Sequence, residues 1–102
     1  MVRSAIALAL AAGAAPQFAM LPAQVSPGSH AVVMVRARTS CTLSIRYKSG
    51  RLQVLGSAVS RHGIDGWNWG VPAAAPVGPA RVSVACAGMR RAVRTVAVTA
   101  WQ

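Results

Sequence analysis

The chain has 102 residues, which is enough for one domain and no more. It carries 11 lysine and arginine residues against a single acid, Asp65, so its formal net charge is +10 at pH 7. One carboxyl group excludes the two-carboxylate mechanisms of most glycosidases and the oxygen-ligated Ca²⁺ or Mg²⁺ sites, which need several such groups. A basic surface favours anionic partners, although an arginine-rich composition without a specific partner gives the same charge.

The N-terminal segment has the features of a secretory signal. Arg3 supplies a positive charge, and residues 5–15 are uncharged and apolar. A bilayer core needs roughly 20 apolar residues to be crossed, so this run is too short to be a membrane anchor. We therefore expect no transmembrane anchor after cleavage. An alanine-rich N-terminal helix of a cytosolic protein is the alternative.

Two cleavage sites fit the requirement for small residues before the cut. A cut after Ala14 has small residues at the last and third-last positions before the cut, but it leaves a short apolar run. A cut after Ala23 is better placed, but its third-last residue is the larger Leu21. We favour Ala23. The predicted organisation is a signal peptide over residues 1–23 and a mature extracytoplasmic domain over residues 24–102.

The mature chain predicts an all-β fold, because β-branched and aromatic runs of strand length alternate with glycine and proline. The first predicted strand covers residues 31–37. The clearest strand covers residues 41–48, where apolar and polar residues alternate strictly. We expect these two to form an antiparallel hairpin around residues 38–40, with Val35 opposite Ile45 and Val33 opposite Tyr47.

Four further strands are predicted along the rest of the chain. They cover residues 52–55, 66–71, 81–86 and 93–100, with a turn at 87–89. In the last strand, Val96 and Val98 are the predicted inward residues. A total of five to seven strands suits a β-sandwich.

Cys41 and Cys86 are the only cysteines, and each lies on the apolar face of an alternating strand. Two inward cysteines of an exported chain are expected to be oxidised. Metal ligation would need further ligands, and neither His30 nor His62 has a suitable spacing. Two buried free thiols are the remaining alternative if the chain is not exported.

Five short motifs occur in a characteristic order. They are a Cys-bearing strand at 39–45, a Tyr-x-Ser-Gly turn at 47–50, Trp-x-Trp at 67–69, a Pro-Gly turn at 76–79 and a second Cys-bearing strand at 82–86. This order resembles short immunoglobulin-like or fibronectin-III-like modules of secreted and surface-attached bacterial proteins. The resemblance implies an immunoglobulin-like β-sandwich with one disulfide between Cys41 and Cys86, packed against at least one tryptophan. Such modules are not usually so basic, and their fold hosts many unrelated roles.

The sequence offers no catalytic residues. His62 and Asp65 lie in a turn-rich stretch, residues 61–66, and the nucleophile turn of a serine hydrolase does not occur. We interpret this stretch as a solvated loop, and we expect no enzymatic activity, cofactor or metal.

Two groups of side chains are candidate binding residues, although solvated strands and a core are their plainer interpretations. The candidate basic patch comprises Arg36, Arg46, Lys48, Arg90, Arg91 and Arg94. The candidate aromatic platform, or core, comprises Trp67, Trp69 and Trp101. The predicted function is a non-enzymatic secreted or surface binding module that engages a protein or an anionic cell-envelope polymer. A small carbohydrate-binding module that uses surface tryptophans is the alternative, and we do not expect nucleic acid as a partner.

Overall fold

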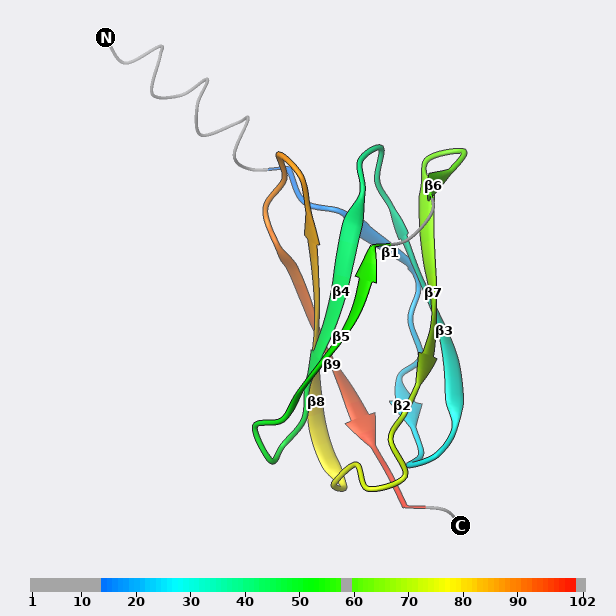
Figure 1. Ribbon diagram of the computed structural model, residues 1–102, viewed down its shortest axis with the longest axis vertical. Helices are drawn as coiled ribbons and strands as arrows, with labels where there is room; N and C mark the ends of the chain where they lie inside the picture. Colours follow the sequence, from blue (N-terminus) through cyan, green and yellow to red (C-terminus); the bar gives the residue numbers. More distant parts are fainter. Residues whose placement is uncertain (1–13, 58–59, 101–102) are drawn as a thin grey trace, which may run out of the picture.

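The computed structural model describes residues 14–57 and 60–100, which form two facing β-sheets (Figure 1). The first sheet has the strand order β1-β3-β7-β6 and the second the order β2-β9-β8-β4-β5. The predicted all-β sandwich is therefore confirmed. The strands are β1 (Gln17–Met20), β2 (Gln24–Val25), β3 (His30–Arg36), β4 (Cys41–Arg46), β5 (Leu52–Ser57), β6 (Ser60–Arg61), β7 (Ile64–Gly70), β8 (Gly78–Cys86) and β9 (Ala92–Val98).

The core lies between the sheets and follows from the alternation within each strand. In β4, every second residue from Cys41 is buried, while the residues between them are half-buried or exposed. The same period of two operates in β8 and in β7. The fully buried side chains include Leu43 and Ile45 from the second sheet and Val33, Val35 and Trp69 from the first. The inward positions predicted for Val96 and Val98 are also buried.

The predicted hairpin between residues 31–37 and 41–48 is wrong. These residues form β3 and β4, which belong to different sheets. In the register, Val35 pairs with Asp65 of β7, and Ile45 pairs with Gln53 and Val82. Alternation shows which side of a strand is apolar, but apolar faces can meet either side by side or across a core. The chain crosses from one sheet to the other between β3 and β4, so their apolar faces lie opposite each other across the core and both are buried.

Three short strands were not predicted. β1 lies inside the predicted signal peptide, at residues that pair with β3, and β2 adds a two-residue parallel pairing to β9. The remainder of the predicted apolar signal run, before residue 14, lies outside the described residues. No helix long and apolar enough to cross a bilayer occurs in the described part of the chain.

The third unpredicted strand, β6, corrects the interpretation of residues 61–66 as an open loop. His62 and Gly63 form a two-residue turn between β6 and β7, with φ values of 53° and 77°. Two consecutive positive φ angles match the twist of a tight hairpin. His62 is exposed at this turn, whereas Asp65 lies on the inward face of β7 and has no exposed surface.

The predicted bridge between Cys41 and Cys86 is confirmed, and its place in the fold is specific. The two residues are directly opposite each other on β4 and β8, with their Cα atoms 4.1 Å apart. Both belong to the buried cluster that also contains Trp67 and Trp69. Because β4 and β8 are neighbours in one sheet, the bridge joins adjacent strands and does not connect the two sheets.

A network of hydrogen-bonded side chains connects the two sheets near the C-terminal end of β4. The indole Nε1 of Trp69 donates hydrogen bonds to the Tyr47 hydroxyl at 3.1 Å and to the side-chain oxygen of Gln53 at 3.3 Å. The Tyr47 hydroxyl also donates to that oxygen, and the Gln53 amide nitrogen donates to the carbonyl of Gly70 at 3.0 Å. The buried polar atoms of these side chains are thus paired within the protein.

This network makes stability sensitive to alkaline pH. Burial raises the pKa of the Tyr47 hydroxyl above 10.0, against the opposing influences of the hydrogen bond from Trp69 and the charge of Arg51. The neutral Tyr47 hydroxyl makes its full contribution to the free energy of unfolding below about pH 10, where the tyrosine of the unfolded chain also keeps its proton. That contribution is lost as the pH rises through the folded-state pKa of Tyr47. We expect the free energy of unfolding to fall less steeply above about pH 10 in Tyr47→Phe than in the wild type. Denaturant unfolding across this pH range tests the difference, and equal slopes would contradict it.

Candidate binding face

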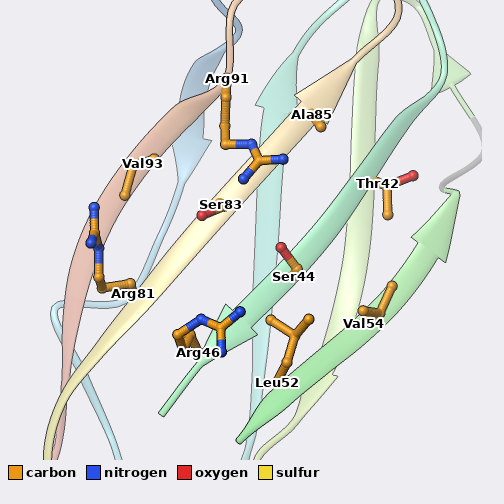
Figure 2. Close-up of a pocket in the computed structure, with 10 residues that line it drawn as sticks. All are labelled: Thr42, Ser44, Arg46, Leu52, Val54, Arg81, Ser83, Ala85, Arg91 and Val93. Atoms are coloured by element: carbon orange, nitrogen blue, oxygen red, sulfur yellow. The ribbon is translucent and has the colours of Figure 1, made fainter. Parts of the chain in front are cut away.

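The outward side of the second sheet carries the candidate site. The alternation that buries Leu43 and Ile45 in β4 turns Ser44 and Arg46 to the outside, and β8 does the same with Arg81 and Ser83. Together with β5 and β9 these strands form a shallow depression of about 470 Å³ (Figure 2). We call this surface the outer arginine face; it is lined by Thr42, Ser44, Arg46, Leu52, Val54, Arg81, Ser83, Ala85, Arg91 and Val93.

The arginines of this face lack a compensating negative charge. Arg46 and Arg81 are direct cross-strand partners on β4 and β8, and like charges in that arrangement destabilise a sheet. One Arg46 nitrogen, Nη1, donates to the carbonyl of Gly50 at 2.8 Å, which holds the side chain without neutralising it. The only acid of the chain, Asp65, is fully buried on the other sheet. The Arg46–Arg81 pair is therefore open to an anion from outside.

Hydroxyl groups and an apolar border complete the outer arginine face. Ser44 and Ser83 are opposite each other, two residues along their strands from the arginine pair. Figure 2 shows Arg91 reaching over β8 toward Ser83, while Arg46 lies below Ser44. On β5, at the edge of the sheet, Leu52 and Val54 are 49% and 57% exposed. Guanidinium and hydroxyl donors beside an apolar edge suit a ligand that has both anionic oxygens and carbon surface.

The predicted basic patch is distributed over several surfaces. Of its six residues, only Arg46 and Arg91 line the outer arginine face. Arg36 lies on β3 of the other sheet, Lys48 in the turn after β4, and Arg90 in the turn before β9. The Arg94 guanidinium lies over the Phe18 ring, 5.5 Å from its centroid. Arg81 was missed, because only the pairing of β4 with β8 places it beside Arg46.

Trp67 and Trp69 belong to the core and do not form a surface platform. They are 7% and 0% exposed, and the Trp67 Nε1 donates to the carbonyl of Gly56 at 3.0 Å. Gly56 stands at an irregularity in the pairing of β4 with β5 and has a φ of 73°, which suits glycine. Trp101 lies outside the described residues. The described ranges also contain no group of three or more His, Cys, Asp or Glu residues that could hold a metal ion.

The fold has solved counterparts, although no family model and no curated protein matches the chain. The structure of Escherichia coli alpha-2-macroglobulin activated by porcine elastase is similar, with a TM-score of 0.60 and 18% identity over 81% of this chain. The trypsin-activated form of alpha-2-macroglobulin from Escherichia coli is similar with a TM-score of 0.61 and 18% identity over 85% of this chain. The chain corresponds to only 8% and 7% of the lengths of those chains.

At this level of identity the likeness concerns the fold alone. Fold and disulfide together define the class of protein: a small β-sandwich of two sheets, with one bridge between neighbouring strands of the larger sheet.

Proposed function

We propose that this protein is a non-enzymatic, immunoglobulin-like module that works outside the cytoplasm and binds an anionic polymer of the cell envelope. The outer arginine face is its binding surface. The observation that carries the proposal is the cross-strand pair of Arg46 and Arg81, which no acidic side chain in the described part of the molecule neutralises. A sheet that keeps two like charges side by side gives up stability, and an anionic ligand offsets that loss.

The strand order supports an immunoglobulin-like classification. Immunoglobulin sandwiches place strands A, B, E and D in one sheet and C, F and G in the other, and variable-type domains add C′. The orders β1-β3-β7-β6 and β2-β9-β8-β4-β5 correspond to A-B-E-D and A′-G-F-C-C′. The bridge differs, because antibody domains connect B with F across the sheets, whereas Cys41 and Cys86 occupy the C and F positions.

The disulfide supports a location outside the cytoplasm, where such bonds form and persist. Polymers of that compartment with repeated phosphate or carboxylate groups suit the outer arginine face, since planar guanidinium groups bind these anions through two parallel hydrogen bonds. The acidic surface of another protein offers the same groups at irregular spacing. A repeating polymer is the better match, because each of its repeats presents the same anionic group to the outer arginine face.

Binding to poly(glycerol phosphate) tests the proposal. We expect Arg46→Gln combined with Arg81→Gln to weaken binding and to reduce the slope of log affinity against log salt by about two, about one for each lost phosphate contact. The measurement is fluorescence anisotropy with the labelled polymer over a series of salt concentrations. Neutral dextran serves as the ligand control.

The matched variant removes the same charge from the end of β3 and from the loop that follows it. Arg36→Gln combined with Arg38→Gln changes two exposed arginines away from the outer arginine face. This pair should leave most of the affinity and the salt slope intact. If both double variants lose affinity equally, binding depends on net charge alone and the outer arginine face is not the site.

The carbohydrate-binding alternative receives no support from the described residues. Its platform requires exposed indole rings, and two of the three candidates, Trp67 and Trp69, are buried and hydrogen-bonded inside the sandwich. A ligand that stacked on either ring would have to displace the core.

A further inference from the structure

The residues just before the predicted cleavage point at Ala23 are part of the sandwich. β1 runs antiparallel to β3, with Gln17 opposite Arg36 and Phe18 opposite Val35 (Figure 1). The pairing places β1 at the edge of the first sheet, next to a strand whose inward residues are fully buried. A mature chain that began after Ala23 would lack this strand.

Side chains of the same segment fill the open side of the sandwich between the sheets. Pro16 is buried, and Phe18 and Leu21 pack against the core. The Phe18 ring also lies beneath the Arg94 guanidinium of β9, at 5.5 Å, and so connects the first sheet with the second. A cation over an aromatic ring contributes about 0.5–1 kcal/mol at an exposed site.

Backbone hydrogen bonds hold both ends of the segment. The Arg90 amide donates to the carbonyl of Ala14 at 2.7 Å, and the Ala97 amide donates to the carbonyl of Ala23 at 3.1 Å. The contacts of the segment begin at Ala14, whose hydrogen bond would be lost by a cut directly after that residue, whereas the contacts from Pro16 onward would stay with the mature chain. They run without interruption into β2, whose Gln24 and Val25 pair with β9.

Loss of β1 would make β3 an exposed, aggregation-prone edge strand of the first sheet. β3 has the sequence HAVVMVR, which contains three valines and no acid. In the complete fold it is paired on both sides, by β1 and by β7. Without β1, one row of its backbone groups would be open to pairing with other chains, and segments of this composition are prone to such aggregation.

We propose that the export signal is removed after Ala14, so that the mature protein begins at Ala15 and keeps β1. This inference rests on the extracytoplasmic location proposed above. Ala12 and Ala14 supply the small residues that the peptidase requires, whereas the site after Ala23 has the larger Leu21 at the corresponding position. The apolar run that remains, residues 5–11, lies within the usual range for a signal. The mature domain therefore covers residues 15–102 and replaces the predicted range 24–102.

The test is N-terminal sequencing and intact-mass measurement of the protein exported by a bacterial host that expresses the full chain. We expect an N-terminus at Ala15 and slow hydrogen exchange at those amides of Gln17–Met20 that face β3. An exported protein that begins at Gln24 would overturn the processing proposal and leave the export proposal standing. A full-length chain that stays in the cytoplasm would overturn both.

Two matched variants locate the cut independently. Ala14→Arg places a large charged residue directly before the proposed cut and should cause the precursor to accumulate. Ala23→Arg makes the same change at an exposed position that contributes only its carbonyl to the fold, and it should be processed like the wild type. The reverse pattern would place the cut after Ala23 and contradict the proposal.

Discussion

Replacing both cysteines, as Cys41→Ala with Cys86→Ala, is expected to lower the free energy of unfolding by roughly 4 kcal/mol. The two residues are 45 positions apart in the sequence, so the bridge closes a long loop and removes many conformations from the unfolded chain. A domain of this size has a small core, and a loss of that magnitude is a large part of its stability. Denaturant unfolding of the oxidised wild type and the double variant measures the difference.

Two comparisons separate the bridge from the packing of its side chains. Cys41→Val with Cys86→Val fills the buried space with apolar groups and should be nearly as destabilised as the alanine pair. Reduced wild-type protein keeps the native side chains and should also lose most of the roughly 4 kcal/mol. If the valine pair is as stable as the oxidised wild type, then the pairing of β4 with β8 is sufficient and the bridge adds nothing.

The second large effect has the opposite sign: Asp65→Val is expected to raise the free energy of unfolding by about 1–3 kcal/mol. Asp65 has no exposed surface, and neither of its carboxyl oxygens has a hydrogen-bond partner among the described residues. Burying a polar group without a hydrogen-bond partner removes its hydration, and no interaction in the folded protein compensates for that loss of free energy. Valine has a similar volume, favours strands and suits the neighbouring Val35 of β3.

The same unfolding experiments, performed at neutral pH, test this expectation. Asp65→Asn is the matched control, because it removes the carboxyl group but keeps a polar group in the same place, and its gain should be smaller. If Asp65→Val is less stable than the wild type, the carboxyl group has a stabilising role that its surroundings do not explain.

Strand positions and the orientation of their residues could be predicted well. Six predicted strands correspond to β3, β4, β5, β7, β8 and β9. In β4 and β8 the alternation identified the buried side, and with it the inward direction of Cys41 and Cys86. This information is local, since a side chain that points to one face of a strand does so whatever the strand pairs with.

The candidate site was predictable only in part. The candidate basic patch includes Arg46 and Arg91 but not Arg81, and its other four residues do not line the outer arginine face. A surface on a sheet is composed of residues from several strands, and its composition depends on which strands are neighbours. The sequence predicted β3 as the neighbour of β4, whereas the neighbours of β4 are β5 and β8.

By itself, the sequence determined an all-β domain, the inward faces of its main strands, a pair of inward cysteines and a strongly basic composition with one acid. These properties depend on the periodicity of two and on composition, which can be read from the chain directly. The tertiary structure alone decided which strands pair, that the bridge lies within one sheet, that β1 belongs to the domain and that Asp65 is buried. Pairing between strands distant in the sequence depends on how all the apolar faces can be buried together, and no local pattern records that outcome.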